Sequence, residues 1–209
     1  MEMKTLKDQV ADWKREQILR VASELFYTKG FSRTSMDDIA STLAIGKPMI
    51  YSYFPSKIAL LAAVCNQTSH LVASLAETIA KADAQSPAQL MHSIIYEVSL
   101  RIVEGSQPLA VLFREVKHLP PSSLAQLKHS DTRFREIMIG ILRQGKAAGE
   151  FHYEADERVI AQSISGMLTW LFTWYRDSGP LRAEEVAEQM ALIVLQTAGC
   201  VASEALGEK

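Results

Sequence analysis

Apolar residues recur every three or four positions along almost all of this 209-residue chain. That spacing places them on one face of an α-helix, whereas a half-buried strand would alternate apolar and polar residues. Proline and glycine interrupt the pattern at intervals, as they do between helices. We therefore predict an all-α fold of about nine helices. The predicted helices cover residues 12–29, 36–43, 47–54, 57–85, 87–104, 108–118, 122–148 and 156–176, with a last helix starting near residue 182.

Two short predicted helices near the N-terminus are joined by the turn LAIG. Ser35 caps the first of them, and Asp38, three residues later, completes a capping box. Pro48 is tolerated in the second helix because a first-turn N–H has no partner within the helix. Two short helices across such a turn have the proportions of a helix-turn-helix, whose second helix enters the DNA major groove N-terminus first. The residues that this helix would present to DNA are Lys47, Pro48, Met49, Tyr51 and Ser52.

The aromatic residues of GKPMIYSYFPSK are predicted to point in two directions, one toward the protein interior and two toward DNA. Phe54 lies four residues after Ile50, so both are predicted to face the interior of the small N-terminal bundle. Tyr51 and Tyr53 carry hydroxyls that can donate to phosphate oxygens, and Lys57 can add a positive charge beside them. The alternative is that all three aromatics belong to the core, since aromatic residues at helical spacing are more often buried than in contact with a ligand.

Charge is unevenly distributed along the chain, although the formal net charge is only −2. Residues 1–60 contain nine Lys and Arg against seven Asp and Glu, while residues 61–209 contain 13 against 17. A basic N-terminal segment on an acidic remainder suits a nucleic-acid surface, although so small an asymmetry decides nothing alone.

The sequence contains no motif for catalysis or metal binding. Cys65 and Cys200 lie far apart and belong to no cluster with metal-ligand spacing, so we expect reduced, structural thiols. There is no nucleophile elbow, phosphate-binding glycine loop or pair of catalytic carboxylates. We therefore predict that the protein is not an enzyme and uses no cofactor and no metal. Without a leader peptide or an uncharged apolar run of about 18 residues, we also expect a soluble, cytoplasmic chain with no membrane partner.

One continuous stretch, about residues 14–62, resembles the DNA-binding domain of the tetracycline-repressor-like (TetR) family of bacterial transcription regulators. The resemblance rests on ILRVASELFYTKGFSRT followed by SMDDIASTLAIGKPMIYSYFPSKIALL. Ile58 departs from the family pattern, in which an acidic residue is common, and Ser52 stands where a bulkier residue is frequent. The resemblance implies a DNA-binding domain over residues 1–60 and an effector-binding and dimerisation domain over residues 61–209. The DNA contacts that it implies fall on Thr34, Ser35, Lys47, Pro48, Tyr51, Ser52, Tyr53 and Lys57.

The two predicted helices nearest the C-terminus are apolar on more than one side, so each must bury a second face in a core or against a partner. The resemblance implies that they form a four-helix interface between two copies of the chain. Two copies would read half-sites about one helical turn apart. The alternative is that the same residues form the core of a monomer. The predicted interface residues are Ser163, Gly166, Met167, Trp170, Trp174, Val186, Met190, Ile193 and Val194.

The central helices offer a mostly apolar set of side chains with a few polar tips, as small-molecule sites usually do. The alternative is that these side chains are plain core. The tail WYRDSGPLRAEEVAEQMALIVL is similar to subfamilies whose effectors are acyl-CoA thioesters, which implies that Arg133, Arg135 or Arg176 pairs with the nucleotide phosphates. The candidate pocket residues are Met91, His92, Ile95, Tyr96, Phe113, Val116, Phe134, Met138 and Leu142.

Several functions are compatible with this pattern. The first is a dimeric repressor that a small apolar or acyl-CoA-type effector releases from operator DNA. A helical adaptor or lipid-binding protein without specific DNA binding is the second, and an activator or a regulator without a ligand also stays open. DNA affinity over a salt series separates the adaptor from the regulators, because neutralised phosphates make log affinity fall linearly with log salt.

Overall fold

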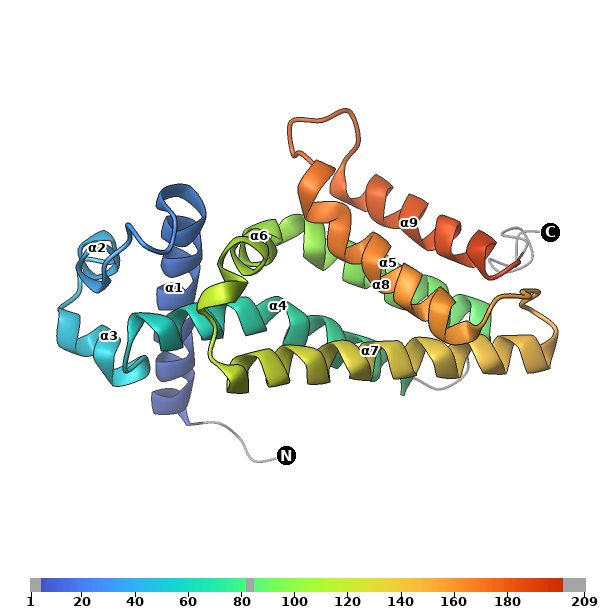
Figure 1. The fold of residues 1–209 in the computed structure, drawn as a ribbon, viewed down its shortest axis with the longest axis horizontal. Coiled ribbons are helices and arrows are strands. Elements are labelled where there is room, and N and C mark those ends of the chain that lie inside the picture. Colours follow the sequence, from blue (N-terminus) through green and yellow to red (C-terminus); the bar gives the residue numbers. More distant parts are fainter. Residues whose placement is uncertain (1–4, 82–84, 201–209) are drawn as a thin grey trace. The chain divides into compact units, whose positions relative to one another are not determined.

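The computed structural model describes residues 5–81 and 85–200, and every regular element in that part of the chain is helical. The predicted all-α fold with nine α-helices is confirmed over these residues (Figure 1). The elements are α1 (Leu6–Lys29), α2 (Met36–Thr42), α3 (Lys47–Tyr53), α4 (Lys57–Ala80), α5 (Pro87–Glu104), α6 (Ser106–Glu115), the 3₁₀ helix η1 (Val116–His118), α7 (Pro121–Ala148), α8 (Glu157–Trp174) and α9 (Ala183–Thr197).

The chain divides into two compact units that interleave in sequence. The head unit comprises Met1–Gln67 and Gln107–Leu124, and the body unit comprises Thr68–Ser106 and Ala125–Lys209. Helices α4 and α7 each contribute residues to both units. The head unit therefore includes a second segment from the middle of the chain, in addition to the predicted N-terminal domain. The domain boundary at residue 60 stays a prediction.

The head unit is built around α1, α2 and α3, which pack in that order. Thr5 and Asp8 form a capping box that starts α1 at Leu6, earlier than the predicted start near residue 12. Fully burying a large apolar side chain contributes about 1.5–3 kcal/mol to the free energy of folding, relative to leaving it exposed. Several such residues stabilise the head unit. Those buried in the head unit include Ile18, Phe26, Ile39, Ile50 and Leu60.

Helix α6 contributes to the head unit through polar contacts with the end of α1. Arg114 donates hydrogen bonds to the backbone oxygens of Phe26, at 3.1 Å, and Tyr27, at 2.7 Å. The Tyr27 carbonyl is one of the last in α1, which a helix leaves without an internal partner, whereas the Phe26 carbonyl also accepts the backbone N–H of Gly30 at 3.1 Å. The next residue, Glu115, accepts a hydrogen bond from the backbone N–H of Phe31 at 3.4 Å. Two adjacent side chains at the end of α6 thus hold the last turn of α1 and the segment that follows it.

In the body unit α5 packs against both α8 and α9, and α8 also contacts α9. A salt bridge joins α4 to α7, because the Arg133 Nε donates to the Glu77 carboxylate at 2.6 Å. The interior is apolar, and the largest fully buried side chains in it are Met91, Ile94, Ile95, Met138, Leu142 and Phe151.

The turn after α7 depends on a glycine within the helix. The backbone N–H groups of Glu150 and Phe151 donate to the carbonyl oxygen of Gly145, at 2.9 and 3.2 Å. This fold-back places the buried Phe151 ring directly on α7. A Cβ at Gly145 would lie only 2.1 Å from Cδ2 of that ring. Gly145 therefore allows a close approach between a side chain and helix backbone that no other residue permits without a shift.

Helix α4 is long and apolar enough to cross a membrane by length and composition alone, as the core helices of soluble proteins also are. Leu60, Leu61 and Val64 on this helix are completely buried within the head unit. The first part of α4 therefore uses its apolar residues to pack within the head unit.

Candidate nucleic-acid interface

Helices α2 and α3 form the helix-turn-helix, and the turn between them is closed by backbone hydrogen bonds. The N–H of Ile45 donates to the Ala40 carbonyl at 3.0 Å, and the N–H of Ala44 donates to that of Ser41 at 3.1 Å. Ala44 has a φ of 52°, a left-handed conformation that is uncommon outside glycine. Gly46, in extended conformation, is the N-cap of α3. These bonds close the turn within a few residues and start α3 directly after it.

Helix α3 has an inner and an outer face. Ile50 and the C-cap residue Phe54 are buried, which confirms the prediction that both face inward. Tyr51, by contrast, is 46% exposed. Ser52 is exposed too, although its hydroxyl donates to the Met49 carbonyl at 2.6 Å. The predicted contact residues that are exposed on α3 are Lys47, Pro48, Met49, Tyr51 and Ser52, and Tyr53 is half-buried.

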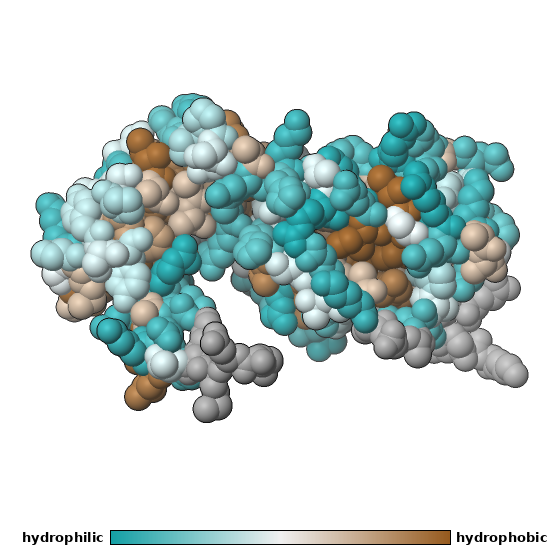
Figure 2. Space-filling view, turned by 90° about the horizontal axis from the view of Figure 1, so that it is seen from below, coloured by the Kyte–Doolittle hydropathy of each residue, from teal (hydrophilic) through white to brown (hydrophobic). Residues whose placement is uncertain are grey.

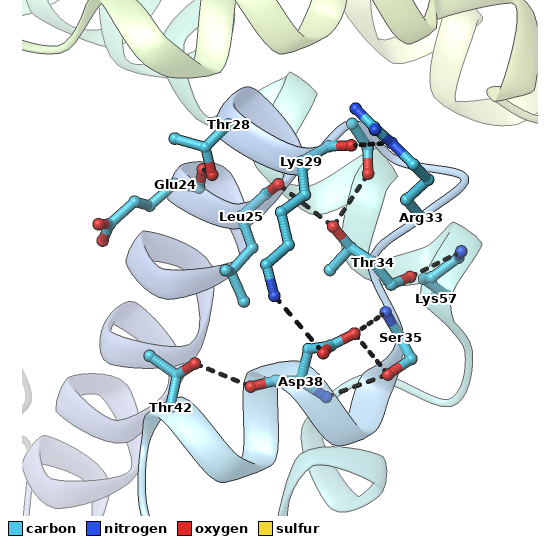
Figure 3. Close-up of polar contacts among 11 residues, drawn as sticks. Glu24, Leu25, Thr28, Lys29, Arg33, Thr34, Ser35, Asp38, Thr42 and Lys57 are labelled. Carbon is cyan, nitrogen blue, oxygen red and sulfur yellow. Dashed lines mark hydrogen bonds and ion pairs between the residues drawn. The ribbon is translucent and has the colours of Figure 1, made fainter.

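Ser35 forms the predicted capping box with Asp38 at the start of α2 (Figure 3). The Ser35 hydroxyl donates to the Asp38 carboxylate at 2.7 Å, and the backbone N–H of Ser35 donates to the same oxygen at 2.7 Å. These bonds from Ser35, with Lys29 nearby, hold the pKa of Asp38 below its ordinary value. The stabilising effect of this carboxylate is therefore present near neutral pH and is lost as the pH falls through its folded pKa.

Thr34 and Lys57 are engaged inside the head unit (Figure 3). Thr34 is buried, and its hydroxyl donates to the Gly30 carbonyl at 2.9 Å. The Lys57 ammonium donates to the carbonyls of Phe31 and Thr34, each at 2.9 Å, and lies 4.3 Å from the centre of the Phe31 ring. The DNA contacts of both residues stay predictions. The Lys57 ammonium also donates to the Ser32 carbonyl at 3.5 Å, and the backbone N–H of Thr34 donates to the Phe31 carbonyl at 3.2 Å. A DNA contact by either residue would therefore have to replace or share a bond within the head unit.

Replacing Lys57 by methionine is expected to lower the free energy of unfolding by about 2 kcal/mol. The substitution removes hydrogen bonds from a charged donor, which contribute about 1.5–3 kcal/mol, and leaves the Phe31 and Thr34 carbonyls without that partner. Urea unfolding followed by circular dichroism measures the loss. Lys47→Met is the matched control, because Lys47 is an exposed lysine of the same unit and its removal should leave the midpoint unchanged. Equal midpoints for the two variants would contradict a structural role for Lys57.

Lys47, the first residue of α3, pairs with Asp37 near the start of α2. The Lys47 Nζ and the Asp37 carboxylate are 2.6 Å apart, and their side chains are 49% and 63% exposed. The hydrogen bond from this carboxylate raises the pKa of Lys47 above its ordinary value. The one basic side chain on the outer face of α3 is therefore held by an acidic side chain of α2.

The candidate pocket residues fall in both units. Phe113 and Val116 belong to the head unit and are exposed there. In the body unit, His92 lies 3.0 Å from Glu188 and stacks on Tyr96 at a ring distance of 6.3 Å. That all nine line one pocket stays a prediction. The candidate residues located in the body unit are Met91, His92, Ile95, Tyr96, Phe134, Met138 and Leu142, and His92 and Tyr96 are its only half-buried members.

The three arginines predicted to pair with nucleotide phosphates lie in the body unit. Each of them donates hydrogen bonds to side chains or carbonyls of this unit. Arg133 is bonded to Glu77, as above, and Arg135 donates to Asp131 at 2.6 Å and to the Gln162 side chain at 2.8 Å. Arg176 is exposed and donates to the adjacent Tyr175 carbonyl at 2.7 Å. Phosphate pairing by these arginines stays a prediction.

The predicted dimer residues separate into a buried and an exposed group. Val186, Met190 and Val194 of α9 are buried in the body unit. Figure 2 shows apolar areas interrupting a hydrophilic surface, and large apolar side chains stay exposed at several places in the described chain. The predicted residues that are exposed on α8 and α9 are Ser163, Gly166, Trp170, Trp174 and Ile193, and Met167 is half-buried.

Sequence reasoning missed three residues that shape the head unit. Arg114 and Glu115 contact residues more than eighty positions away, at the end of α1. No local pattern reveals a pair so distant in sequence. Asp37 was overlooked although its neighbour Asp38 was recognised as the capping residue. An acidic residue with no capping role at the head of α2 was a signal that could have been followed.

Two short helices joined by a tight turn, with an exposed outer face on the second, are the features of the helix-turn-helix class of DNA-binding proteins. In this chain they are α2 and α3. Residues 18–64 match the family "Bacterial regulatory proteins, tetR family", and residues 84–198 match "Tetracyclin repressor-like, C-terminal domain". The chain therefore belongs to the TetR family of transcriptional regulators, as the resemblance in its N-terminal segment implied.

Among curated proteins, the chain is similar to the HTH-type transcriptional repressor KstR2 of Mycolicibacterium smegmatis, at 28% identity over 187 residues, 87% of this chain and 89% of that protein. Among solved structures it is similar to the TetR-family regulator PfmR of Thermus thermophilus, at 27% identity and a TM-score of 0.76, covering 86% and 97% of the two chains. The fold also matches AibR in complex with isovaleryl coenzyme A and operator DNA, at 23% identity, a TM-score of 0.72 and coverages of 86% and 96%.

Proposed function

We propose that this regulator is a cytoplasmic homodimer that represses transcription and leaves its operator when a small apolar or acyl-CoA-type molecule binds to it. The observation that carries the proposal is the outer face of α3, where Tyr51 and its neighbours are exposed while Ile50 anchors the helix from the other side. A rigid helix with accessible polar tips is what readout in the major groove requires. Family membership supports a regulator rather than an enzyme.

A stripe on α8 supports the dimer. Val159, Ser163, Gly166, Trp170 and Trp174 recur every three or four positions and all are exposed. Exposed tryptophans on one helical face mark a protein interface more often than solvent-facing surface. A second copy would cover this stripe, and small residues at positions 163 and 166 would let the two helices approach closely. A twofold dimer would also bring two copies of α3 to a pseudo-palindromic operator.

For the effector, support comes from the body unit and from the relatives. The interior of the body unit is apolar, with His92 and Tyr96 as polar tips among the candidate residues. The structurally similar AibR has been crystallised with isovaleryl coenzyme A and operator DNA, and the related KstR2 is a repressor. In one form of the dimer the two α3 helices would match the spacing of the operator half-sites, and in another they would not. An effector that binds more tightly to the second form would lower DNA affinity, by an amount set by the ratio of its affinities for the two forms.

The test is fluorescence anisotropy with the DNA upstream of the protein's own gene and with a scrambled copy, over a salt series. Tight binding to the first DNA alone is expected, and Tyr51→Ala should weaken it by about 10-fold or more, because a hydrogen bond to a charged acceptor contributes about 1.5–3 kcal/mol. Tyr51→Phe, which removes only the hydroxyl, separates that bond from packing of the ring.

Equally weak binding to both DNAs would be followed by selection from a random-sequence pool. If that selection also yields no preferred sequence, the repressor proposal fails and the adaptor or lipid-binding alternative takes its place. Adding isovaleryl coenzyme A to the operator complex then tests the effector class, and an unchanged complex would remove this acyl-CoA from the proposal.

A further inference from the structure

The ion pair formed by Asp37 and Lys47 joins the two helices of the helix-turn-helix. Lys47 is the first residue of α3 and Asp37 the second of α2, so the 2.6 Å contact spans the two helices across the turn. Both side chains remain largely exposed. The pair is therefore on the accessible side of the motif, where the proposed interface with DNA lies.

The capping of α2 does not account for Asp37. Ser35 and Asp38 already provide both halves of the capping box. The partner found for the Asp37 carboxylate is the Lys47 ammonium. An exposed ion pair of this kind adds little to folding stability. A carboxylate on a surface that faces phosphates is also electrostatically unfavourable for binding. Its place in the first turn of α2 favours the helix by at most about 1 kcal/mol, so a larger effect is to be sought in the interaction with DNA.

Lys47 has two kinds of partner available on DNA. Phosphate oxygens occur on every sequence and supply nearly all of the non-specific affinity. Acceptors on base edges, such as N7 and O6 of guanine, occur only where the sequence places them and when α3 is seated in the groove. A lysine without a local partner would bind phosphates of any DNA. A lysine held by Asp37 gains less from a phosphate, because it must first give up the carboxylate.

We infer that Asp37 is a specificity-determining residue that keeps Lys47 from contributing to sequence-independent binding and releases it on the operator. This inference rests on the proposed DNA-binding function. It is a form of discrimination against the wrong partner, since the carboxylate penalises the non-specific complex more than the specific one. In the operator complex, seating of α3 gives Lys47 an acceptor at a fixed position that replaces Asp37.

The variant that tests the inference is Asp37→Asn, which keeps the size of the side chain and removes its charge. Affinity for scrambled DNA is expected to rise about fivefold to tenfold, and the slope of log affinity against log salt to steepen by about 0.9, the value for one additional neutralised phosphate. Affinity for the operator should rise less, by about threefold or under, so that the ratio of operator to scrambled affinity falls. Anisotropy over a salt series gives all three quantities.

Three controls distinguish this role from a change in net charge. Glu24→Gln removes a negative charge from an exposed position of α1 and should leave the slope for scrambled DNA unchanged. Asp37→Glu retains a carboxylate and should behave as the wild type. In a Lys47→Gln background, Asp37→Asn should no longer alter the slope, because the residue through which it acts is missing.

The inference is overturned if Asp37→Asn raises operator and scrambled affinity equally, if the slope for scrambled DNA is unchanged, or if the effect persists in the Lys47→Gln background. Each of these outcomes leaves the wild-type preference for operator DNA intact. Loss of any sequence preference in the wild type itself would instead refute the proposed function. Thermal unfolding of each variant verifies that the compared proteins are folded.

Discussion

Gly145→Ala is expected to lower the free energy of unfolding by about 2–3 kcal/mol, the usual cost of forcing additional atoms into a packed interior. The new methyl group would lie 2.1 Å from Cδ2 and 2.4 Å from Cε2 of Phe151. The ring is rigid and only 1% of the residue is exposed, so it cannot turn aside without disturbing its neighbours. Urea unfolding followed by circular dichroism measures the effect.

Gly140→Ala, on the same helix, is the control. Nothing lies within 4 Å of a Cβ at this position, so the substitution should stabilise α7 by about 0.5–1 kcal/mol, the difference between alanine and glycine in a helix interior. In a Phe151→Ala background the cost of Gly145→Ala should largely disappear, because the clash is removed. If Gly145→Ala instead stabilises the protein as Gly140→Ala does, the fold-back of Phe151 onto α7 is incorrect.

Trp170→Glu is expected to convert the proposed dimer to monomers at micromolar concentration. A buried tryptophan at the centre of an interface commonly contributes 2 kcal/mol or more, about 30-fold in the dissociation constant, and an introduced charge without a partner adds to the loss. Analytical ultracentrifugation over a concentration series gives the constant. Operator affinity should fall with dimerisation, because a monomer presents a single α3 to one half-site.

Trp13→Glu is matched to this variant. Trp13 is 60% exposed on α1 in the head unit, and Trp170 is 58% exposed on α8 in the body unit. Both substitutions remove an exposed indole and add one negative charge, but only Trp170 lies on the α8 stripe. A dimer that survives Trp170→Glu, or one that dissociates equally in both variants, would place the interface elsewhere.

The sequence was sufficient for the parts of the fold that short-range chemistry determines. The Ser35 and Asp38 capping box lies within four consecutive residues, and the inward direction of Ile50 and Phe54 follows from helical spacing alone. The start of α1 was placed too late because the prediction followed the apolar stripe. The capping box at Thr5 determines where the helix begins, although Leu6 and Val10 in its first turns are exposed.

Contacts between distant segments were beyond prediction. Lys57 has the charge and position of a phosphate ligand, and nothing nearby in sequence indicates that the carbonyls of Phe31 and Thr34 engage it. Similarly, Phe113 and Val116 share the amphipathic pattern of a core helix, and periodicity does not tell with which unit such a helix packs. The candidate DNA residues on α3 were predictable because they need only one helix and its direction.

The interleaving of the two units limits how this regulator can exchange parts with its relatives. The chain passes between the units after residues 67, 106 and 124. A chimera spliced only after residue 67 would inherit a new helix-turn-helix while retaining the old Arg114 and Glu115, whose partners lie at the end of α1. Transplanting operator preference between such proteins therefore requires two inserts, the N-terminal segment together with residues 107–124, and recombination at a single crossover would tend to yield mismatched heads.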